Sequence, residues 1–160
     1  MHFDKDTFLR VVDATPFVSI DLVIRNELQQ VLLGYRLNRP AQHHWFVPGG
    51  RIRKNERTQD ALQRIARTEL GIGAGPGRLL GVFDHIYADN YYGEPGIGTH
   101  YVVCAYEFDV DGGVALRQDE QHERLRWWNV DELLDSRAVH ENAKLYFRDV
   151  PGNGFRCHRG

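Results

Sequence analysis

Five residues between positions 48 and 72 have types and spacings that could carry chemistry. They are Gly50, Glu56, Arg64, Glu69 and Gly71. Glycine lets the backbone approach a bound group that a side chain would block, and carboxylates and guanidinium groups can hold cations and anions. Any one of these residues would more often be structural, as in a surface helix after a Gly-Gly turn. Their joint spacing favours a functional loop followed by a helix.

The helix expected after this loop runs over residues 58–70. Its apolar residues recur three and four positions apart, which gives one buried stripe made of Ala61, Leu62, Ile65 and Ala66. Thr58 is expected to cap the start of the helix and Gly71 to end it. Ile65 and Glu69 lie four positions apart, so they share one edge of the helix.

This stretch resembles the Nudix box, G-x5-E-x7-R-E-U-x-E-E-x-G-U with U aliphatic. The matching positions are Gly50, Glu56, Arg64, Ala66, Glu69, Gly71 and Ile72. The ligand of such a box is a divalent cation that bridges a pyrophosphate, and the full motif gathers three helix carboxylates around it. Here Ile65 and Thr68 stand where two of those acids would be, and Glu69 alone is kept. One carboxylate suits a single ion whose other ligands are further oxygens.

Upstream of the loop, a hairpin is expected from strands over residues 17–24 and 31–36. Asp21 lies inside the first strand, where it either faces solvent or lines a cleft. Arg36 ends the second strand, and the chain then leads to the Gly-Gly loop, so Arg36 is positioned to reach the same phosphate. Arg39 is interpreted as an ordinary surface arginine.

The remaining segments predict a mixed α/β fold. We expect a helix over 4–14, strands over 78–87 (carrying His85), 99–110 and 123–128, helices over 129–134 and 139–147, and a mobile loop over 88–98 that covers a site. Strands and helices interleave without a regular repeat, which favours a mixed sheet between helices. This is compatible with the Nudix fold, an α/β/α sandwich. We expect a single domain over 1–150 and a loosely ordered polar tail over 151–160.

Composition limits the classes of partner. The chain has 160 residues, 20 basic against 22 acidic, and a net charge of -2 with no long basic run, which argues against nucleic-acid binding. No apolar run is long enough to cross a membrane, and the first residues lack a signal-peptide layout, so the cytoplasm is the expected compartment. Cys104 and Cys157 are accordingly interpreted as free thiols.

Further segments resemble the GDP-mannose mannosyl hydrolase family, a Nudix branch in which the same two box carboxylates are missing. They are Pro40-Ala41-Gln42, Trp45-Phe46-Val47-Pro48-Gly49-Gly50-Arg51, Thr99-His100-Tyr101-Val102-Val103, Asp119-Glu120-Gln121-His122 and Asn142-x3-Tyr146-Phe147. The resemblance implies hydrolysis of GDP-mannose, and of GDP-glucose, to GDP and free sugar. It also implies one Mg²⁺ per subunit, attack of water at the anomeric carbon with inversion, and a homodimer.

The same resemblance implies roles for individual residues. Mg²⁺ would be held by the Gly49 carbonyl, Glu69 and the Gln121 side chain. His122 would be the general base. The diphosphate or the departing GDP would be supported by Arg36, Arg51, Arg64 and Tyr101, while Asp21 and His85 match active-site positions. Glu56 is expected to support the loop rather than to bind metal.

Several alternatives stay open. Glu120 and Glu123 are rival bases, and His100 is interpreted as a packed or surface histidine. Instead of a glycosyl hydrolase, the chain could be a Nudix pyrophosphatase that cleaves a nucleoside diphosphate derivative at phosphorus, with sugar phosphate as a product. It could also be a non-catalytic module that binds nucleotide sugars tightly without Mg²⁺-dependent turnover.

Overall fold

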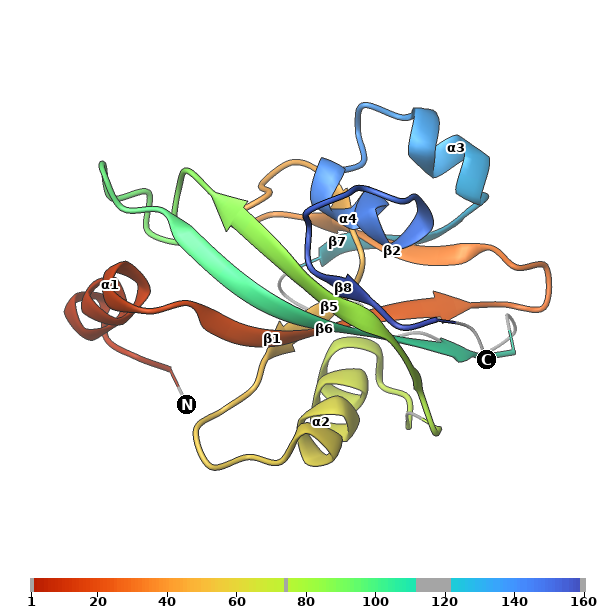
Figure 1. Ribbon diagram of the computed structural model, residues 1–160, viewed down its shortest axis with the longest axis horizontal. Helices are drawn as coiled ribbons and strands as arrows, with labels where there is room; N and C mark the ends of the chain where they lie inside the picture. The colour runs from red at the N-terminus through yellow and green to blue at the C-terminus, as the bar shows by residue number, and fades with distance from the viewer. Residues whose placement is uncertain (1, 74, 112–121, 159–160) are drawn as a thin grey trace.

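The computed structural model describes residues 2–73, 75–111 and 122–158, with the backbone alone at positions 122 and 123 (Figure 1). In chain order its elements are α1 (Lys5–Ala14), β1 (Phe17–Arg25), β2 (Val31–Arg36), β3 (Trp45–Phe46), β4 (Gly49–Arg51), α2 (Thr58–Leu70), β5 (Arg78–Tyr87), β6 (Thr99–Asp109), β7 (His122–Trp128), α3 (Val130–Asp135), α4 (Glu141–Lys144), the 3₁₀ turn η1 (Leu145–Phe147) and β8 (Phe155–Arg156). The longer strands β1, β2, β5, β6 and β7 fall where the sequence predicted them, whereas β3, β4 and β8 were not predicted.

The described strands join one mixed sheet. Its main order is β3-β2-β1-β6-β5-β8, with β4 paired to β1 and β7 paired to β2. The long central pair, β1 and β6, is parallel, and the other pairs are antiparallel. A mixed sheet is what the irregular alternation of helices and strands favoured.

Along one edge, strand β1 pairs with two different strands, and the site lies where these two strands separate. Its middle pairs with β4 through Ser19, Ile20 and Asp21, whereas its end meets β2 only at Arg25, opposite Val31. The expected hairpin of β1 and β2 is therefore paired only beside the turn, and β2 forms its longer ladder with β7. The glycine-rich segment enters the sheet in the gap between them.

Helices cover both faces of the sheet, as Figure 1 shows with α2 on one side and α3 and α4 on the other. Apolar side chains of α2 pack against one face in a cluster that contains Ile20, Leu22, Ile24, Leu62, Ile65 and Leu70. The other face packs against α3 and α4 in a cluster that contains Val23, Phe46, Phe83, Trp128, Leu133 and Tyr146. The expected α/β/α sandwich is confirmed. Because both faces are covered, the β1 side chains between Ser19 and Ile24 are all buried.

Helix α2 follows the glycine-rich loop over the residues that its periodicity predicted. Gly71 ends it in the left-handed region at φ 70°, where glycine has no Cβ penalty. The predicted cap at its start was wrong, because Arg57 occupies the capping position and makes no side-chain capping bond, while Thr58 is already helical. Asp4 does cap α1, where its carboxylate accepts from the Thr7 amide.

Two elements near the end of the chain differ from expectation. The predicted helix over 139–147 begins at Glu141, after His140 caps it, and tightens into η1. Phe155 and Arg156 form β8 on the edge of β5, whereas a loosely ordered tail was expected. Gly81 permits this pairing, because a Cβ there would lie 2.0 Å from the Phe155 carbonyl oxygen.

Cys104 and Cys157 are both free, as expected. Within the described ranges, no helix has the length and apolar character that a membrane crossing requires.

Candidate functional site

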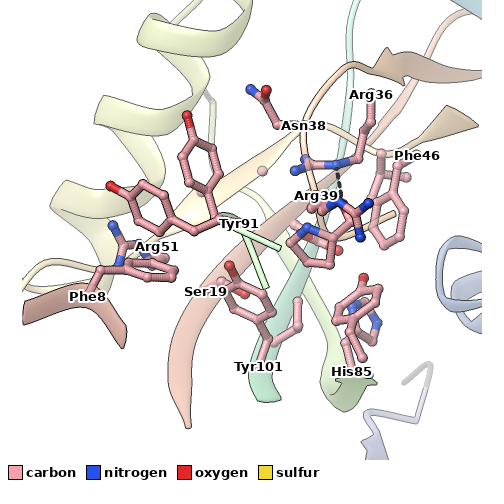
Figure 2. A pocket seen from close by; sticks show the side chains of 18 of the residues that line it. Phe8, Ser19, Arg36, Asn38, Arg39, Phe46, Arg51, His85, Tyr91 and Tyr101 are labelled. Atoms are coloured by element: carbon pink, nitrogen blue, oxygen red, sulfur yellow. Dashed lines mark hydrogen bonds between the residues drawn. The ribbon is translucent and has the colours of Figure 1, made fainter. Parts of the chain in front are cut away.

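A pocket of about 400 Å³ opens beside the glycine-rich strand β4 (Figure 2). Seven of the residues given a functional role from the sequence line it: Asp21, Arg36, Gly49, Gly50, Arg51, His85 and Tyr101. They come from five strands that are separated in sequence, and the divided edge of β1 brings them together. Their meeting follows from the sheet topology.

Gly49 touches the strand that carries Asp21. The two residues are register partners, and a Cβ on Gly49 would lie 2.4 Å from Asp21 Oδ1 and 2.6 Å from the Ile20 carbonyl oxygen. Contacts that short do not occur in folded proteins, so this position requires glycine. The backbone of the loop can thus lie directly against a carboxylate that faces the pocket.

Asp21 is buried, with 7% of its surface exposed, so the solvent-facing alternative is excluded. Its carboxylate accepts a hydrogen bond from the Tyr146 hydroxyl, and that hydroxyl lies 3.2 Å from His85 Nε2. Burial raises the pKa of Asp21 from 3.8 to about 7, although the Tyr146 hydrogen bond and the charge of Arg36 oppose this rise. Asp21 can therefore exchange a proton near neutral pH.

His85 is 2% exposed and lies at the inner end of this hydrogen-bonded row. Burial, with a smaller contribution from the nearby His140, lowers the pKa of His85 to about 3. The imidazole is therefore neutral at physiological pH. A neutral imidazole beside a phenol and a carboxyl group can donate or accept a proton without carrying a buried charge.

Arg36 and Tyr101 face the pocket from neighbouring parts of the sheet. Arg36 Nε donates to the Pro40 carbonyl oxygen at 3.0 Å (Figure 2). This hydrogen bond fixes the orientation of the guanidinium and of its remaining N–H groups. Burial raises the pKa of the Tyr101 phenol, while the charges of Arg51 and Arg36 lower it. Tyr101 therefore stays a neutral hydroxyl donor beside two positive charges, an arrangement that suits a phosphate.

Arg51 is held among aromatic rings of the N-terminal segment. Its guanidinium lies 4.7 Å from the ring centre of Phe17, 5.6 Å from that of Phe3 and 5.8 Å from that of Phe8. Cation–π contacts of this kind orient a guanidinium without neutralising it. The start of β1, together with α1 and the residue Phe3 before it, thus positions a positive charge at the pocket.

Arg64 is not among the residues that line this pocket. Its Nε donates to Glu56 Oε1 at 2.6 Å, and Nη2 donates to Glu56 Oε2 at 2.9 Å and to the Arg51 carbonyl oxygen at 2.8 Å. These bonds attach α2 to both ends of the loop. The expected supporting position of Glu56 is observed, and a direct phosphate contact by Arg64 stays a prediction.

The residues that replace the two acids of the box are not metal ligands. Ile65 is buried, and its Cγ1 lies 3.2 Å from the place that a Cβ on Gly50 would occupy. The isoleucine therefore packs α2 against the loop, while Thr68 is exposed on the helix.

Glu69 lies on the buried side of α2, with 7% of its surface exposed, and its charge contributes to raising the pKa of Arg64. Together with the Gly49 carbonyl, it offers oxygen donors from two elements that pack against each other. Oxygen donors are the ligands that Mg²⁺ prefers. Across the ranges that the structure covers, no three His, Cys, Asp or Glu side chains gather as a metal cluster. This donor set fits a Mg²⁺ ion that takes further oxygens from elsewhere.

The expected base and the third metal ligand fall at the limit of the described chain. The backbone of His122 begins β7 and pairs with Arg36, so this position lies next to a pocket residue. Gln121 and the rival base Glu120 lie outside the described residues. Both the base and the glutamine ligand stay predictions.

Other pocket residues were missed. Phe8, Tyr91 and Tyr92 line it, as does Arg39, which is exposed and pairs with Asp89 at 3.3 Å. Arg39 was interpreted as surface alone. The composition of residues 88–98, which include tyrosine, glycine and proline, did predict a loop over a site. It did not indicate which of these residues face the pocket. His100 is half-buried, and its Nε2 lies 3.3 Å from Asp84 Oδ1, which matches its interpretation as a packed or surface histidine.

Comparison with known proteins decides the family. The NUDIX domain model matches residues 15–148. The chain belongs to the Nudix family. The low-salt glycan biosynthesis protein Agl8 of Haloferax volcanii is 44% identical to this chain over 121 residues, which cover 76% of each chain.

Solved Nudix structures share the fold. The MutT NUDIX hydrolase from Burkholderia pseudomallei is 29% identical, with a TM-score of 0.69 over 82% of this chain and 95% of that one. The MutT protein from Methanosarcina mazei Go1 has the same TM-score at 20% identity, over 84% of this chain and 92% of that one. Family membership supports a hydrolase that uses a divalent cation such as Mg²⁺.

Proposed function

We propose that this Nudix protein hydrolyses GDP-mannose, and GDP-glucose, to GDP and free sugar, by attack of water at the anomeric carbon with inversion. One observation carries the proposal. The pocket joins Arg36 and Arg51 to a buried row of Asp21, Tyr146 and His85, and it lies beside a box helix in which packed Ile65 takes the place of an acid. Attack at phosphorus in Nudix enzymes uses clustered helix carboxylates, and this helix offers few. The relative named for glycan biosynthesis also supports a sugar nucleotide as substrate.

Each part of the reaction needs a different group. Water attacks the anomeric carbon, the bond from that carbon to the β-phosphate oxygen breaks, and GDP leaves with the electron pair. His122 takes the proton of the water. Arg36 and Arg51 bind the diphosphate and stabilise the charge that develops on the leaving group. Tyr101 donates a hydrogen bond to the same oxygens.

The buried row is proposed to hold the sugar. Asp21 accepts hydrogen bonds from sugar hydroxyls when ionised, and Tyr146 and His85 fix its orientation. Arg64 acts through the loop, because its bonds to Glu56 and to the Arg51 carbonyl hold Arg51 in place.

One Mg²⁺ per subunit would be held by Gly49, Glu69 and Gln121, and when bound it would neutralise charge on the departing diphosphate. Replacing Glu69 by Gln removes the only charged ligand of that set. We expect a folded variant whose Mg²⁺-dependent turnover is sharply lower. Metal dependence equal to wild type would refute the single-carboxylate site.

A product assay tests the reaction. Incubation of GDP-mannose with enzyme and Mg²⁺ should yield GDP and mannose. GMP with mannose phosphate would assign the chain to the pyrophosphatases instead, and tight binding without turnover would make it a binding module. The homodimer is part of the proposal, and a monomer mass by light scattering would remove it.

The base has its own test. If His122 takes the proton of the attacking water, the rate should rise with pH through an apparent pKa near the usual histidine value of about 6.5. Replacing His122 by Gln should lower kcat by roughly a hundred- to ten thousandfold and flatten that profile. A fully active variant would give the role to Glu120 or Glu123.

A further inference from the structure

We propose that Phe8, Tyr91 and Tyr92, hereafter the aromatic rim, form a subsite that binds the purine base of a nucleoside diphosphate by stacking. The choice of a nucleoside diphosphate rests on the proposed function. The subsite itself rests on the rings, their support and their place in the pocket, which are independent of the reaction.

The rim is a set of rings in edge-to-face contact. Tyr91 and Tyr92 lie 5.1 Å apart between ring centres at an interplanar angle of 85°. Phe8 lies 5.4 Å from Tyr92 at 71° and 6.2 Å from Tyr91 at 62°. Nearly perpendicular rings make a corner in which a flat group can stack on one face and touch the edge of the next ring.

The two tyrosine rings of the rim are exposed, which leaves them accessible to a ligand. Tyr91 is 51% exposed and Tyr92 is 40% exposed, yet both line the pocket together with the charged residues. Lys5 lies 5.8 Å from the Tyr92 ring centre and backs it, while it pairs with Glu94 at 3.4 Å. Tyr91, the more exposed ring, is therefore assigned as the stacking platform and Tyr92 as the wall beside it.

The loop that carries the tyrosines is built around one buried side chain, so the rim is formed before any ligand arrives. Asn90 is fully buried and donates to the carbonyl oxygens of Glu94, at 2.9 Å, and Ile97, at 2.7 Å. Its oxygen accepts from the amides of Tyr92, at 3.1 Å, and Glu94, at 3.2 Å. A binding surface that is already ordered loses less conformational entropy when a ligand binds. The loop over residues 88–98 is thus held together by the hydrogen bonds of Asn90.

The position of the rim within the pocket predicts how a bound nucleoside diphosphate would be oriented. Figure 2 shows Phe8 and Arg51 at one end of the pocket with Tyr91 beside them, and Phe46 and His85 at the other end, with Tyr101 between. Arg51 also lies over the Phe8 ring. A diphosphate bound at Arg51 would therefore extend its nucleoside toward the rim and its sugar toward Asp21 and His85.

The rim predicts a class of base, not one base. Every base has a π-face, so stacking does not separate guanine from adenine, while the two fused rings of a purine cover more of the platform than a pyrimidine does. The proposed ligand class is purine nucleoside diphosphates.

Calorimetric binding of two probes, GDP and inorganic pyrophosphate, each with Mg²⁺, tests the subsite. Tyr91→Leu should weaken GDP binding by about tenfold to a hundredfold, from the usual worth of one stacked base, and leave pyrophosphate binding within about twofold. Tyr91→Phe should bind GDP as wild type does, because it keeps the ring. Phe155→Leu is the matched control, an exposed aromatic residue on β8 outside this pocket, and should change neither affinity.

Two results would overturn the proposal: unchanged GDP affinity in Tyr91→Leu, or equal losses for GDP and pyrophosphate, which would mean that the rim acts only by holding Arg51. GDP binding wild type no tighter than pyrophosphate would also overturn it. None of these outcomes depends on the products formed from GDP-mannose, so the subsite and the proposed function can fail separately.

Discussion

Two carboxylates flank the same glycine-rich loop, and the structure uses them in opposite ways. Glu56 accepts two bonds from Arg64 and one from the Arg53 amide at 2.9 Å, and the Arg64 hydrogen bonds lower its pKa to about 2. The hydrogen-bond partner of Asp21 is a neutral phenol, and burial raises its pKa to about 7. The two acids differ in cause as well as in direction: burial disfavours the charged form of Asp21, and its phenol partner only partly opposes this, whereas the guanidinium of Arg64 fixes Glu56 as a charged support.

The two carboxylates lie on different sides of the loop, one in its structural support and the other at the pocket. The Glu56–Arg64 pair ties α2 to the end of β4, away from the pocket lining. Asp21 lies across the β1–β4 ladder from Gly49 and faces the pocket. Substitutions on the two sides should therefore change different properties.

The largest expected effect is on the pH dependence of stability in Asp21→Asn. The folded-state pKa of about 7 lies above the ordinary value of 3.8, so folding favours the protonated acid, and the stability contributed by this group falls as pH rises from about 4 to about 7. Asparagine stays neutral throughout. The variant should match wild type near pH 4 and exceed its free energy of unfolding at pH 8 by up to about 4 kcal/mol.

Chemical denaturation at a series of pH values in metal-free buffer measures this difference. His85 has the opposite sign, because its pKa of about 3 lies below 6.5 and its contribution to stability is lost as pH falls through that window. His85 is present in both proteins, so its contribution cancels in the comparison. A constant stability difference at all pH values would show that Asp21 does not titrate in this range.

A smaller effect is expected for Glu56→Gln. Removing the charge leaves a partly buried guanidinium without its ionic partner, so the variant should lose about 2 kcal/mol of stability. The pH profile assigned to Asp21 should keep its shape. Asp13→Asn, an exposed acid on α1, is the control and should be near neutral. Full stability in Glu56→Gln would mean that the pair does not hold the loop.

The smallest expected effect belongs to Tyr146→Phe. The Tyr146 hydrogen bond lowers the pKa of Asp21, so its removal should raise that pKa further and move the midpoint of the pH profile upward. Stability below that midpoint should fall by about 1 kcal/mol, the usual worth of one hydrogen bond. NMR titration of the Asp21 carboxyl carbon measures the midpoint. A downward move would show that the Tyr146 hydrogen bond does not lower the pKa of Asp21.

The sequence predicted most of the elements because their signals are local. The apolar stripe of α2, its end at Gly71 and the alternation in β1 and in β6 are each patterns among residues close together in the sequence. The pocket residues were predicted from resemblance to a family. Neither periodicity nor composition indicates that Asp21 and His85 meet.

The features that could not be predicted from the sequence depend on contacts between distant segments. The Asp21–Tyr146 bond joins positions 125 apart, and no pattern along the chain encodes it. Strand β8 has two residues, too few for an alternation, and it depends on the space that Gly81 leaves. The aromatic rim combines α1 with the loop after β5, and only the folded chain shows that these rings meet.

Attack of water at carbon, and not at phosphorus, separates the proposed glycosyl hydrolase from a pyrophosphatase. Hydrolysis of GDP-mannose in ¹⁸O-labelled water, with mass analysis of both products, tests it most directly. Attack at the anomeric carbon puts the label in mannose and leaves GDP unlabelled, which is the result this account predicts. Label in a phosphate group of the products would contradict it.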